Sequence, residues 1–251
     1  MKNLIGKSAL VTGGSRGIGA ATVELLAQLG ANVAFNYYKN QQAAESLREK
    51  LISLPGLRFI QQCNVANYND VRNFVSNTIK RFNKIDILIN NAGIWEFGAV
   101  DTMTQDNWHH TMRVNLDSIF YFTKLVVAHM KKDKIAGRII HIASTAGQRG
   151  EAFHSHYAAS KGAIISFTKS LASELGPSGI TVNCVAPGWV NTDMSRPTIA
   201  KEGEKILETI PLNRIPEAYE IAGPIVFLAS EWASAITGEI LNVNAGSVLC
   251  G

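Results

Sequence analysis

A chain of 251 residues is long enough for one large α/β domain or two small domains, and it can bury a sizeable core. Hydrophobic residues make up 46% of it and charged residues 18%, which is the composition of an ordinary globular protein. The formal net charge of +4 comes from scattered lysines and arginines, with no basic run interleaved with aromatic residues. Composition therefore argues against nucleic acid as a partner.

The cysteines and the N-terminal segment bear on location. Cys63, Cys184 and Cys250 are far apart in the sequence, so they suggest no metal site, and a few unpaired thiols suit a reducing compartment. The first residues run directly into a strand-like segment without the pattern of a signal peptide. No stretch reaches the ~18 apolar residues of a membrane span. We expect a cytoplasmic protein that does not enter a membrane.

Short apolar runs alternate with longer helical patterns along the chain. The predicted strands are Ser8–Thr12, Asn32–Tyr37, Arg58–Cys63, Ile85–Asn90, Arg138–Ala143, Thr181–Val185 and Glu239–Val243. The predicted helices lie near 17–29, 41–53, 68–82, 104–131, 156–176 and 217–230. This alternation is typical of βαβ units around a parallel sheet. Because no proline- or serine-rich linker and no internal repeat divides the chain, residues 1–251 are predicted to form a single domain.

A glycine-rich turn, TGGSRGIG, follows the first predicted strand at residues 12–19. Gly13, Gly17 and Gly19 would let the backbone turn tightly and approach a pyrophosphate at the N-terminus of a helix. A tight turn without a ligand is the alternative. The position of the glycines between a strand and a helix favours a nucleotide site.

The most specific pattern in the chain combines Ser144, Tyr157 and Lys161. Tyr157 and Lys161 are at positions i and i+4 of a predicted helix and so share one face, and Ser144 follows a predicted strand. A nearby ammonium lowers the pKa of a phenol, and a shift from about 10 to about 7 corresponds to about 4 kcal/mol. Although the pair alone is common on helix surfaces, the set of three predicts a tyrosine that acts as a general acid.

Polar and turn-forming residues fall at or just after four of the predicted strand ends. These residues are Thr12, Asn90, Ser144 and Pro187. In parallel sheets, ligands bind beyond the carboxyl ends of the strands, so we expect these residues to meet at one cleft.

Taken in order, these motifs resemble those of the short-chain dehydrogenase/reductase family. Further segments that carry the resemblance are Asn90–Gly93, Asn115 in VNLDSIF, PGWVNTD at 187–193 and ITGEILNVNAG at 236–246, so it runs nearly end to end. Within the family, the chain is most similar to the 3-oxoacyl-[acyl-carrier-protein] reductases. The resemblance implies an α/β fold, a single Rossmann-type doubly wound domain with a seven-stranded parallel sheet.

The resemblance also implies roles for four catalytic residues. Tyr157 would donate a proton to the carbonyl oxygen of the substrate, and Ser144 would hold that oxygen. Lys161 would lower the pKa of Tyr157 and bind the nicotinamide ribose. Asn115 would anchor a water molecule that connects Lys161 to solvent, and the nicotinamide would supply the hydride.

The cofactor implied by the resemblance is NADP(H). The residues that it assigns to cofactor binding are Gly13, Ser15, Arg16, Gly17, Ile18, Gly19, Asn36, Tyr37, Asn64, Val65, Asn91, Ala92, Gly93, Tyr157, Lys161, Pro187, Gly188, Val190 and Thr192. Asn64 stands where the family usually has an aspartate that contacts adenine. Because an amide oxygen can still accept a hydrogen bond, we expect a weakened contact there and no loss of binding.

The choice of NADP(H) over NAD(H) depends on charge. NAD enzymes of this fold usually carry an acid at the end of the second strand, where it bonds the adenosine 2′-hydroxyl. Tyr37 occupies that position here, and Arg16 places a cation in the glycine turn. A cation without a nearby acid suits a 2′-phosphate.

The substrate is less constrained by the sequence. Trp95, Phe153, His154 and Trp189 follow strand ends near the motifs and are candidates for its pocket, with ordinary packing as the alternative. The segment Ser195–Pro211 resembles the family's mobile lid. Two substrate classes stay open, a 3-oxoacyl thioester or a small ketone, quinone or sugar.

An acyl carrier protein is a candidate partner. Carrier-protein reductases often place an arginine just before Gly-Ile-Thr-Val, but here that residue is Ser178. A group of basic residues could still form a docking face for an acidic carrier, although a solvated helix end is the default interpretation. These residues are Lys131, Lys132, Lys134 and Arg138.

Two predicted helices are apolar on more than one face, at 116–130 and 163–172. A helix that is apolar most of the way round must be covered on both sides. The resemblance implies a homotetramer in which these helices form a four-helix interface and the C-terminal segment 242–251 is buried between subunits.

Overall fold

A seven-stranded parallel sheet forms the centre of the protein, seen here in a computed structural model that describes residues 4–249. The strands are β1 (Ser8–Val11), β2 (Asn32–Tyr37), β3 (Arg58–Gln62), β4 (Ile87–Asn90), β5 (Arg138–Ile142), β6 (Thr181–Pro187) and β7 (Ile240–Val243). Their order is β3-β2-β1-β4-β5-β6-β7, and each neighbouring pair is parallel. The predicted doubly wound α/β fold is confirmed.

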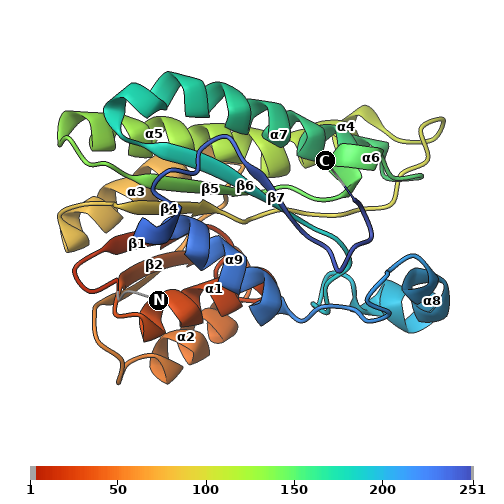
Figure 1. The fold of residues 1–251 in the computed structure, drawn as a ribbon, viewed down its shortest axis with the longest axis horizontal. Coiled ribbons are helices and arrows are strands. Elements are labelled where there is room, and N and C mark those ends of the chain that lie inside the picture. The colour runs from red at the N-terminus through yellow and green to blue at the C-terminus, as the bar shows by residue number, and fades with distance from the viewer. Residues whose placement is uncertain (1–3, 250–251) are drawn as a thin grey trace.

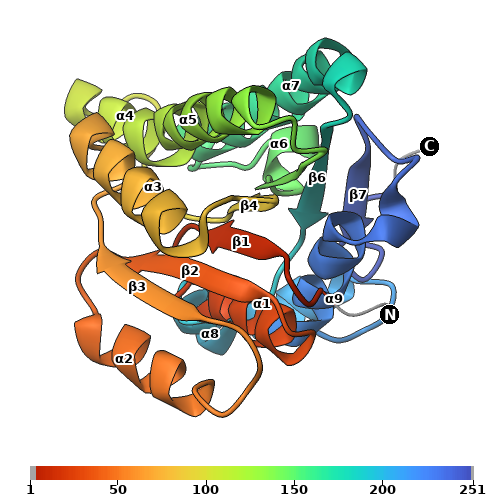
Figure 2. The ribbon, with the colours of Figure 1, turned by 90° about the vertical axis from the view of Figure 1, so that its left-hand side faces the viewer.

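Helices cover both faces of the sheet (Figures 1 and 2). One face carries α1 (Gly17–Gln28), α2 (Gln41–Lys50) and α9 (Ala218–Ala229). The other carries α3 (Tyr68–Phe82), α4 (Gln105–Met112), α5 (Ser118–Lys132) and α7 (Ser155–Leu175). The short α6 (Ala146–Arg149) follows β5, and α8 (Arg196–Glu208) lies to one side of the sheet (Figure 1). The remaining short helical segments are η1 (Arg113–Asp117), η2 (Gly176–Ser178) and η3 (Glu231–Ala233).

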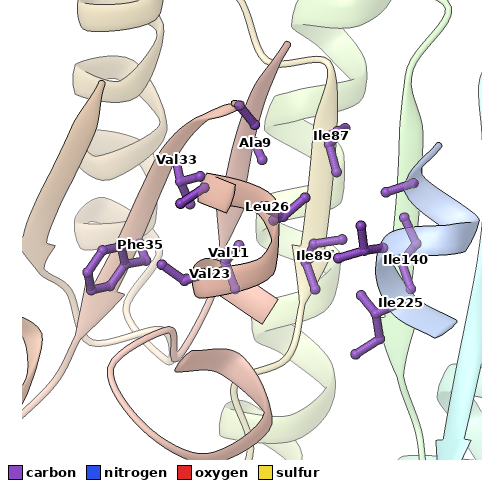
Figure 3. Packing of buried hydrophobic residues seen from close by; sticks show 14 of the residues in the cluster. Ala9, Val11, Val23, Leu26, Val33, Phe35, Ile87, Ile89, Ile140 and Ile225 are labelled. Carbon is purple, nitrogen blue, oxygen red and sulfur yellow. The ribbon is translucent and has the colours of Figure 1, made fainter. Parts of the chain in front are cut away.

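The two largest hydrophobic clusters among the described residues lie on opposite faces of the sheet. Successive strand residues point to opposite faces, so Val11 joins one core and Leu10 the other. In the first core, Leu26 of α1 and Ile225 of α9 meet the strands (Figure 3). Because both faces of the central strands are buried, β1 and β4 read as nearly continuous apolar runs in the sequence instead of alternating ones.

The single helix predicted for 104–131 is divided in the structure. The chain forms α4, then η1, a π-helical turn at Arg113–Asp117, then α5. A π-turn inserts one residue into an otherwise continuous helix, which a hydrophobic pattern does not reveal. Such turns are frequent at functional sites, and this one contains Asn115.

The predicted strand ends differ from the observed ones by a few residues at most. β4 begins at Ile87, and the N–H of the preceding Ile85 donates to Nε2 of His129 (3.3 Å). β6 continues to Pro187, where it pairs with Val243 of β7. Within residues 4–249, no helix is both long and apolar enough to cross a membrane.

Candidate active site

A cleft of about 810 Å³ lies beyond the carboxyl ends of the strands, at the edge predicted from the sequence. Most of the predicted site residues line it, namely Gly13, Ser15, Arg16, Gly17, Ile18, Asn36, Tyr37, Asn64, Val65, Asn91, Ala92, Gly93, Ser144, Tyr157, Lys161, Pro187, Gly188, Val190 and Thr192. Gly19 and Asn115 are not among the lining residues and lie behind the cleft wall.

The turn between β1 and α1 is shaped by its glycines. Gly13 and Gly17 have φ angles of +63° and +55°, in the left-handed region that favours glycine. A Cβ on Gly19 would lie 2.3 Å from the carbonyl oxygen of Gly13, so a side chain there would collide with the turn. Gly19 therefore keeps the helix close to the turn.

The start of α1 presents unpaired backbone donors to this turn. The N-cap residue, Arg16, makes no side-chain capping hydrogen bond. The first N–H groups of a helix have no partner within the helix, and the helix dipole adds partial positive charge there. The turn is therefore suited to bind a phosphate group.

Polar side chains hold the turn against the neighbouring strands. Oδ1 of Asn36 accepts a hydrogen bond from the N–H of Gly13 (2.9 Å), and its Nδ2 donates to a backbone carbonyl after β3 (3.0 Å). Oγ1 of Thr12 accepts from the N–H of Asn91 (2.9 Å). Asn36 thus lines the cleft while both of its side-chain polar atoms bond the protein, so its contribution is to position the turn.

At the end of the cleft beside β2, the lining residues described include cations and no carboxylate. The lining residues that end and follow β2 are Asn36, Tyr37, Tyr38, Lys39 and Asn40. The exposed Arg16 reaches the same cleft from the glycine turn, and Nζ of Lys39 lies 5.6 Å from the centroid of the Tyr38 ring.

Asn64 lies at this end as well. Its Oδ1 accepts a hydrogen bond from the N–H of Ala66 (3.1 Å), and its own N–H donates to Oδ2 of Asp70 (3.1 Å). A carbonyl oxygen has two lone pairs, so the adenine contact predicted for Asn64 would share an oxygen already in use.

The predicted catalytic residues come together at the centre of the cleft. Tyr157 and Lys161 lie in the first turns of α7, and Ser144 follows β5. Nζ of Lys161 lies 5.6 Å from the centroid of the Tyr157 ring and donates to the carbonyl oxygen of Ile142 (2.7 Å). Lys161 is only 4% exposed, so its position is held by the protein.

Burial controls the ionisation of this pair. Desolvation and, to a smaller extent, the Glu151 carboxylate raise the pKa of Tyr157 to about 12, against the effect of a hydrogen bond to Ser144. Desolvation also lowers the pKa of Lys161 to about 8. Burial therefore dominates the pKa of Tyr157 in the polypeptide by itself, and the lowering of this pKa toward 7 by Lys161 stays a prediction.

Asn115 supports the site from behind. Its Oδ1 accepts from the N–H of Ile94 (2.8 Å), and its Nδ2 donates to the carbonyl of Ile94 (3.0 Å) and to Oγ of Ser160 (3.2 Å). Oγ of Ser160 donates in turn to the carbonyl of Tyr157 (2.7 Å). Asn115 therefore connects the segment after β4 to α7, and its role as a water anchor stays a prediction.

Aromatic residues and carboxylates line the other end of the cleft, the carboxylates being those of Glu96 and Glu151. Of the four predicted pocket residues, Trp95 and Trp189 line the cleft, with ring centroids 5.6 Å apart in an edge-to-face arrangement. His154 and Phe153 do not line the cleft: the His154 ring stacks on Trp95, and the Phe153 ring stacks on Phe97. Glu151 also lines the cleft but was not predicted from the sequence; the available signal is its place between Ser144 and Tyr157.

The predicted lid contributes only its first residue to the lining. Ser195 lines the cleft together with the preceding Asp193 and Met194, whereas α8 forms a separate helix.

The basic docking group does not reach the cleft. Lys131 and Lys132 end α5, and Arg138 begins β5, whereas Ser144 follows the opposite end of that strand. The structure therefore places this group near the amino ends of the strands, opposite the cleft.

In the part of the chain described, neither the cysteines nor any group of potential metal-binding side chains forms a second functional site. Cys63 and Cys184 are buried, and desolvation raises the pKa of each thiol to about 12. Cys250 lies outside the described residues. Within residues 4–249, no three His, Cys, Asp or Glu side chains are grouped to hold a metal ion.

The fold and the site together define a Rossmann-type oxidoreductase. The sequence model of a family described as enoyl-(acyl carrier protein) reductase matches residues 13–247. The 3-oxoacyl-[acyl-carrier-protein] reductase of Synechocystis sp. is 42% identical over 250 residues, which cover 99% of this chain and all of that protein.

Solved structures agree with the sequence relatives. A short-chain dehydrogenase from Burkholderia cenocepacia in complex with NADP superposes with a TM-score of 0.91 at 35% identity, covering 98% of this chain and 99% of that one. A short-chain dehydrogenase/reductase from Brucella melitensis, also described as a glucose/ribitol dehydrogenase, superposes with a TM-score of 0.93 at 31% identity and covers the full length of both chains. This chain belongs to the short-chain dehydrogenase/reductase family.

Proposed function

We propose that this protein uses NADPH to reduce a ketone to a secondary alcohol, and that the ketone is a 3-oxoacyl thioester. The observation that carries the proposal is the meeting of Ser144, Tyr157 and Lys161 at one cleft that extends to the glycine turn. The similar Synechocystis protein is a 3-oxoacyl-[acyl-carrier-protein] reductase, which supports the thioester and makes an acyl carrier protein a candidate partner.

The cleft has the features that NADP(H) requires. The uncapped start of α1 suits the pyrophosphate, and Gly13 and Gly17 let the backbone approach it. Arg16 and Lys39 supply cations for the 2′-phosphate, beside a strand end without a carboxylate. The similar Burkholderia enzyme was solved in complex with NADP. When bound, the nicotinamide supplies the hydride.

In this scheme Tyr157 delivers the proton. Tyr157 would give its proton to the carbonyl oxygen and become a tyrosinate, while bound NADPH would supply the hydride for the carbonyl carbon, so the ketone becomes an alcohol and the charges balance. Ser144 holds the oxygen beside Tyr157. With a pKa of about 12, Tyr157 is fully protonated at neutral pH yet more acidic than the alcohol formed, which favours reduction. Lys161, whose pKa is about 8, is suited to return a proton to the tyrosinate.

A second candidate is an NADP(H)-dependent reductase of small polar ketones or sugars. The Brucella relative is described as a glucose/ribitol dehydrogenase. The carboxylate of Glu151 beside Trp95 also makes the substrate end of this cleft more polar than an alkyl chain requires.

A substrate panel with NADPH tests the proposal. Acetoacetyl thioester, a free β-keto ester, a quinone and glucose should be compared by the rate of NADPH oxidation, or of NADP⁺ reduction for glucose. We expect the thioester to give the highest kcat/KM. Turnover of glucose with no turnover of either 3-oxoacyl compound would replace this proposal with the second candidate.

We also propose a cytoplasmic homotetramer. The buried free thiols Cys63 and Cys184 suit a reducing compartment. Phe120 of α5 is 48% exposed, a large apolar side chain on a helix predicted to lie in an interface. Of the C-terminal segment predicted to be buried between subunits, residues 250–251 lie outside the described residues. Light scattering at micromolar concentration should give four times the chain mass, and a monomer would contradict the proposal.

A further inference from the structure

The carboxylate of Glu151 is fixed at the substrate end of the cleft. Its Oε1 accepts a hydrogen bond from Nε1 of Trp95 (3.1 Å), and Nδ1 of His154 lies 3.7 Å from the same oxygen. The Trp95 and His154 rings stack with centroids 4.5 Å apart and planes 9° from parallel. The side chain of Glu151 is only 25% exposed. The position of the carboxylate is therefore set by its neighbours before any substrate arrives.

The backbone around Glu151 is equally well held. Phe153 adopts a φ of +60°, an unusual conformation for a bulky residue, which persists only where the surroundings enforce it. Its carbonyl accepts from the N–H of Gly98 (2.8 Å), and its ring stacks on Phe97 with centroids 5.5 Å apart. These contacts join the segment after β4 to the segment that precedes α7, which carries Glu151.

One oxygen of this carboxylate is left for a ligand. Both the Trp95 bond and the His154 contact involve Oε1, whereas Oε2 receives no hydrogen bond from residues 4–249. Desolvation raises the pKa of Glu151 despite the opposing effects of His154, Trp95 and Arg149. The charge of Glu151 also acts on Tyr157, so the two groups lie within electrostatic reach of each other in one cleft.

We propose that Glu151 forms a subsite for a hydrogen-bond donor, a hydroxyl or ammonium group, that the carbonyl substrate carries close to its reacting carbon. The inference rests on the proposed ketone reductase activity and narrows its 3-oxoacyl or ketone substrates to those that carry such a donor. A donor replaces the water that Glu151 loses when the cleft fills, whereas an alkyl group of the same size leaves the carboxylate desolvated and unpaired. A site built in this way selects for the donor.

The test compares three keto esters that differ in one group. Ethyl 4-hydroxy-3-oxobutanoate, ethyl 4-amino-3-oxobutanoate as its ammonium salt, and ethyl 3-oxopentanoate carry a hydroxyl, an ammonium and a methyl group at the same position. We expect the kcat/KM with NADPH to be about tenfold or more higher for the first two than for the methyl compound. Equal or better use of the methyl compound by the unaltered protein would overturn the subsite.

Two variants at the same position assign the effect to Glu151. Glu151→Gln keeps an acceptor oxygen and removes the charge, so it should abolish the preference for ammonium and retain part of the preference for hydroxyl. Glu151→Leu should abolish both preferences. Glu49→Gln, an exposed substitution on α2, is the matched control and should change neither. Because each preference is a ratio within one protein sample, partial misfolding of a variant does not alter it. A Leu variant with unchanged preferences would contradict the proposal.

A binding measurement separates this inference from the proposed function. Trp95 and Trp189 line the cleft, so quenching of tryptophan fluorescence can follow the binding of each ester to the protein with NADP⁺, where no reduction occurs. If no ester is reduced, the proposed function fails. The subsite is still supported if the hydroxyl and ammonium esters bind about tenfold tighter than the methyl ester and Glu151→Leu removes the difference. It is refuted if the three esters bind alike.

Discussion

The two ends of the cleft are built in different ways. At the nucleotide end, Arg16 and Lys39 are exposed, and the backbone of the turn provides the other donors. At the catalytic centre, Lys161 and Asn115 are buried and bond to backbone groups of neighbouring segments. Exposed charges can be exchanged with little effect on the fold, whereas a buried ammonium weakens it. The exposed cations at the nucleotide end therefore cost the fold little stability, whereas the buried lysine at the centre of the cleft destabilises it.

The largest effect should come from the proposed catalytic centre, where a single proton of Tyr157 would be transferred. Tyr157→Phe keeps the ring that packs in the cleft and removes the proton. We expect the reduction rate to fall by about 10²–10⁴-fold with NADPH affinity unchanged, since general acid catalysis has this size. Steady-state kinetics and a fluorescence titration with NADPH measure the two quantities. Half of the normal turnover in this variant would show that Tyr157 is not the donor.

A buried ammonium that serves chemistry should destabilise the fold. The pKa of Lys161 falls from 10.5 to about 8 on folding, which corresponds to a cost of about 3 kcal/mol at neutral pH. Because the folded pKa lies below the unfolded one, this cost is complete below about pH 8 and fades as the pH rises to 10.5. Lys161→Met should therefore unfold at a higher urea concentration than the unaltered protein at neutral pH. The variant also loses the hydrogen bond to Ile142, which reduces its stability advantage by about 1 kcal/mol.

Chemical denaturation at one protein concentration measures this difference. The advantage of Lys161→Met should shrink near pH 10.5, where the unfolded lysine also loses its proton. Lys80→Met, an exposed substitution on α3, is the control for adding a methionine. The expectation is contradicted if the advantage is absent at neutral pH or equal at both pH values.

The nucleotide end should respond in affinity alone. Arg16→Ala removes a charge-assisted contact of about 1.5–3 kcal/mol, so the KM for NADPH should rise by about 10- to 150-fold. The free energy of unfolding should stay the same because Arg16 is exposed. Arg72→Ala on α3 is the exposed control. An unchanged KM for NADPH would show that Arg16 is a solvated surface charge.

The smallest expected effect is the pH dependence of catalysis. If Lys161 must be protonated, kcat/KM for reduction should fall as the pH rises through about 8, by about tenfold for each further unit. Lys161→Arg keeps a positive charge at all these pH values, so whatever activity it retains should lose this decline. A flat profile of the unaltered enzyme across that range would remove Lys161 from the proton pathway.

Local patterns account for the parts of the protein that the sequence predicted well. The positions of Tyr157 and Lys161 on one helix face follow from the helical repeat, and the strands follow from apolar runs between turn residues. Parallel strands carry the residues at their carboxyl ends to one edge, so the cleft could be predicted as well. Each of these inferences uses residues close together in the sequence or a general rule of sheet topology.

The sequence by itself therefore determined the fold class, the cleft and most of the residues that line it. Tertiary structure alone decided the ionisation of Tyr157 and Lys161, because desolvation depends on every segment that excludes water from a group. It also decided that Glu151 faces the substrate end of the cleft, since its bond to Trp95 joins positions 56 residues apart. Such contacts depend on how loops pack between strands, which no local pattern records.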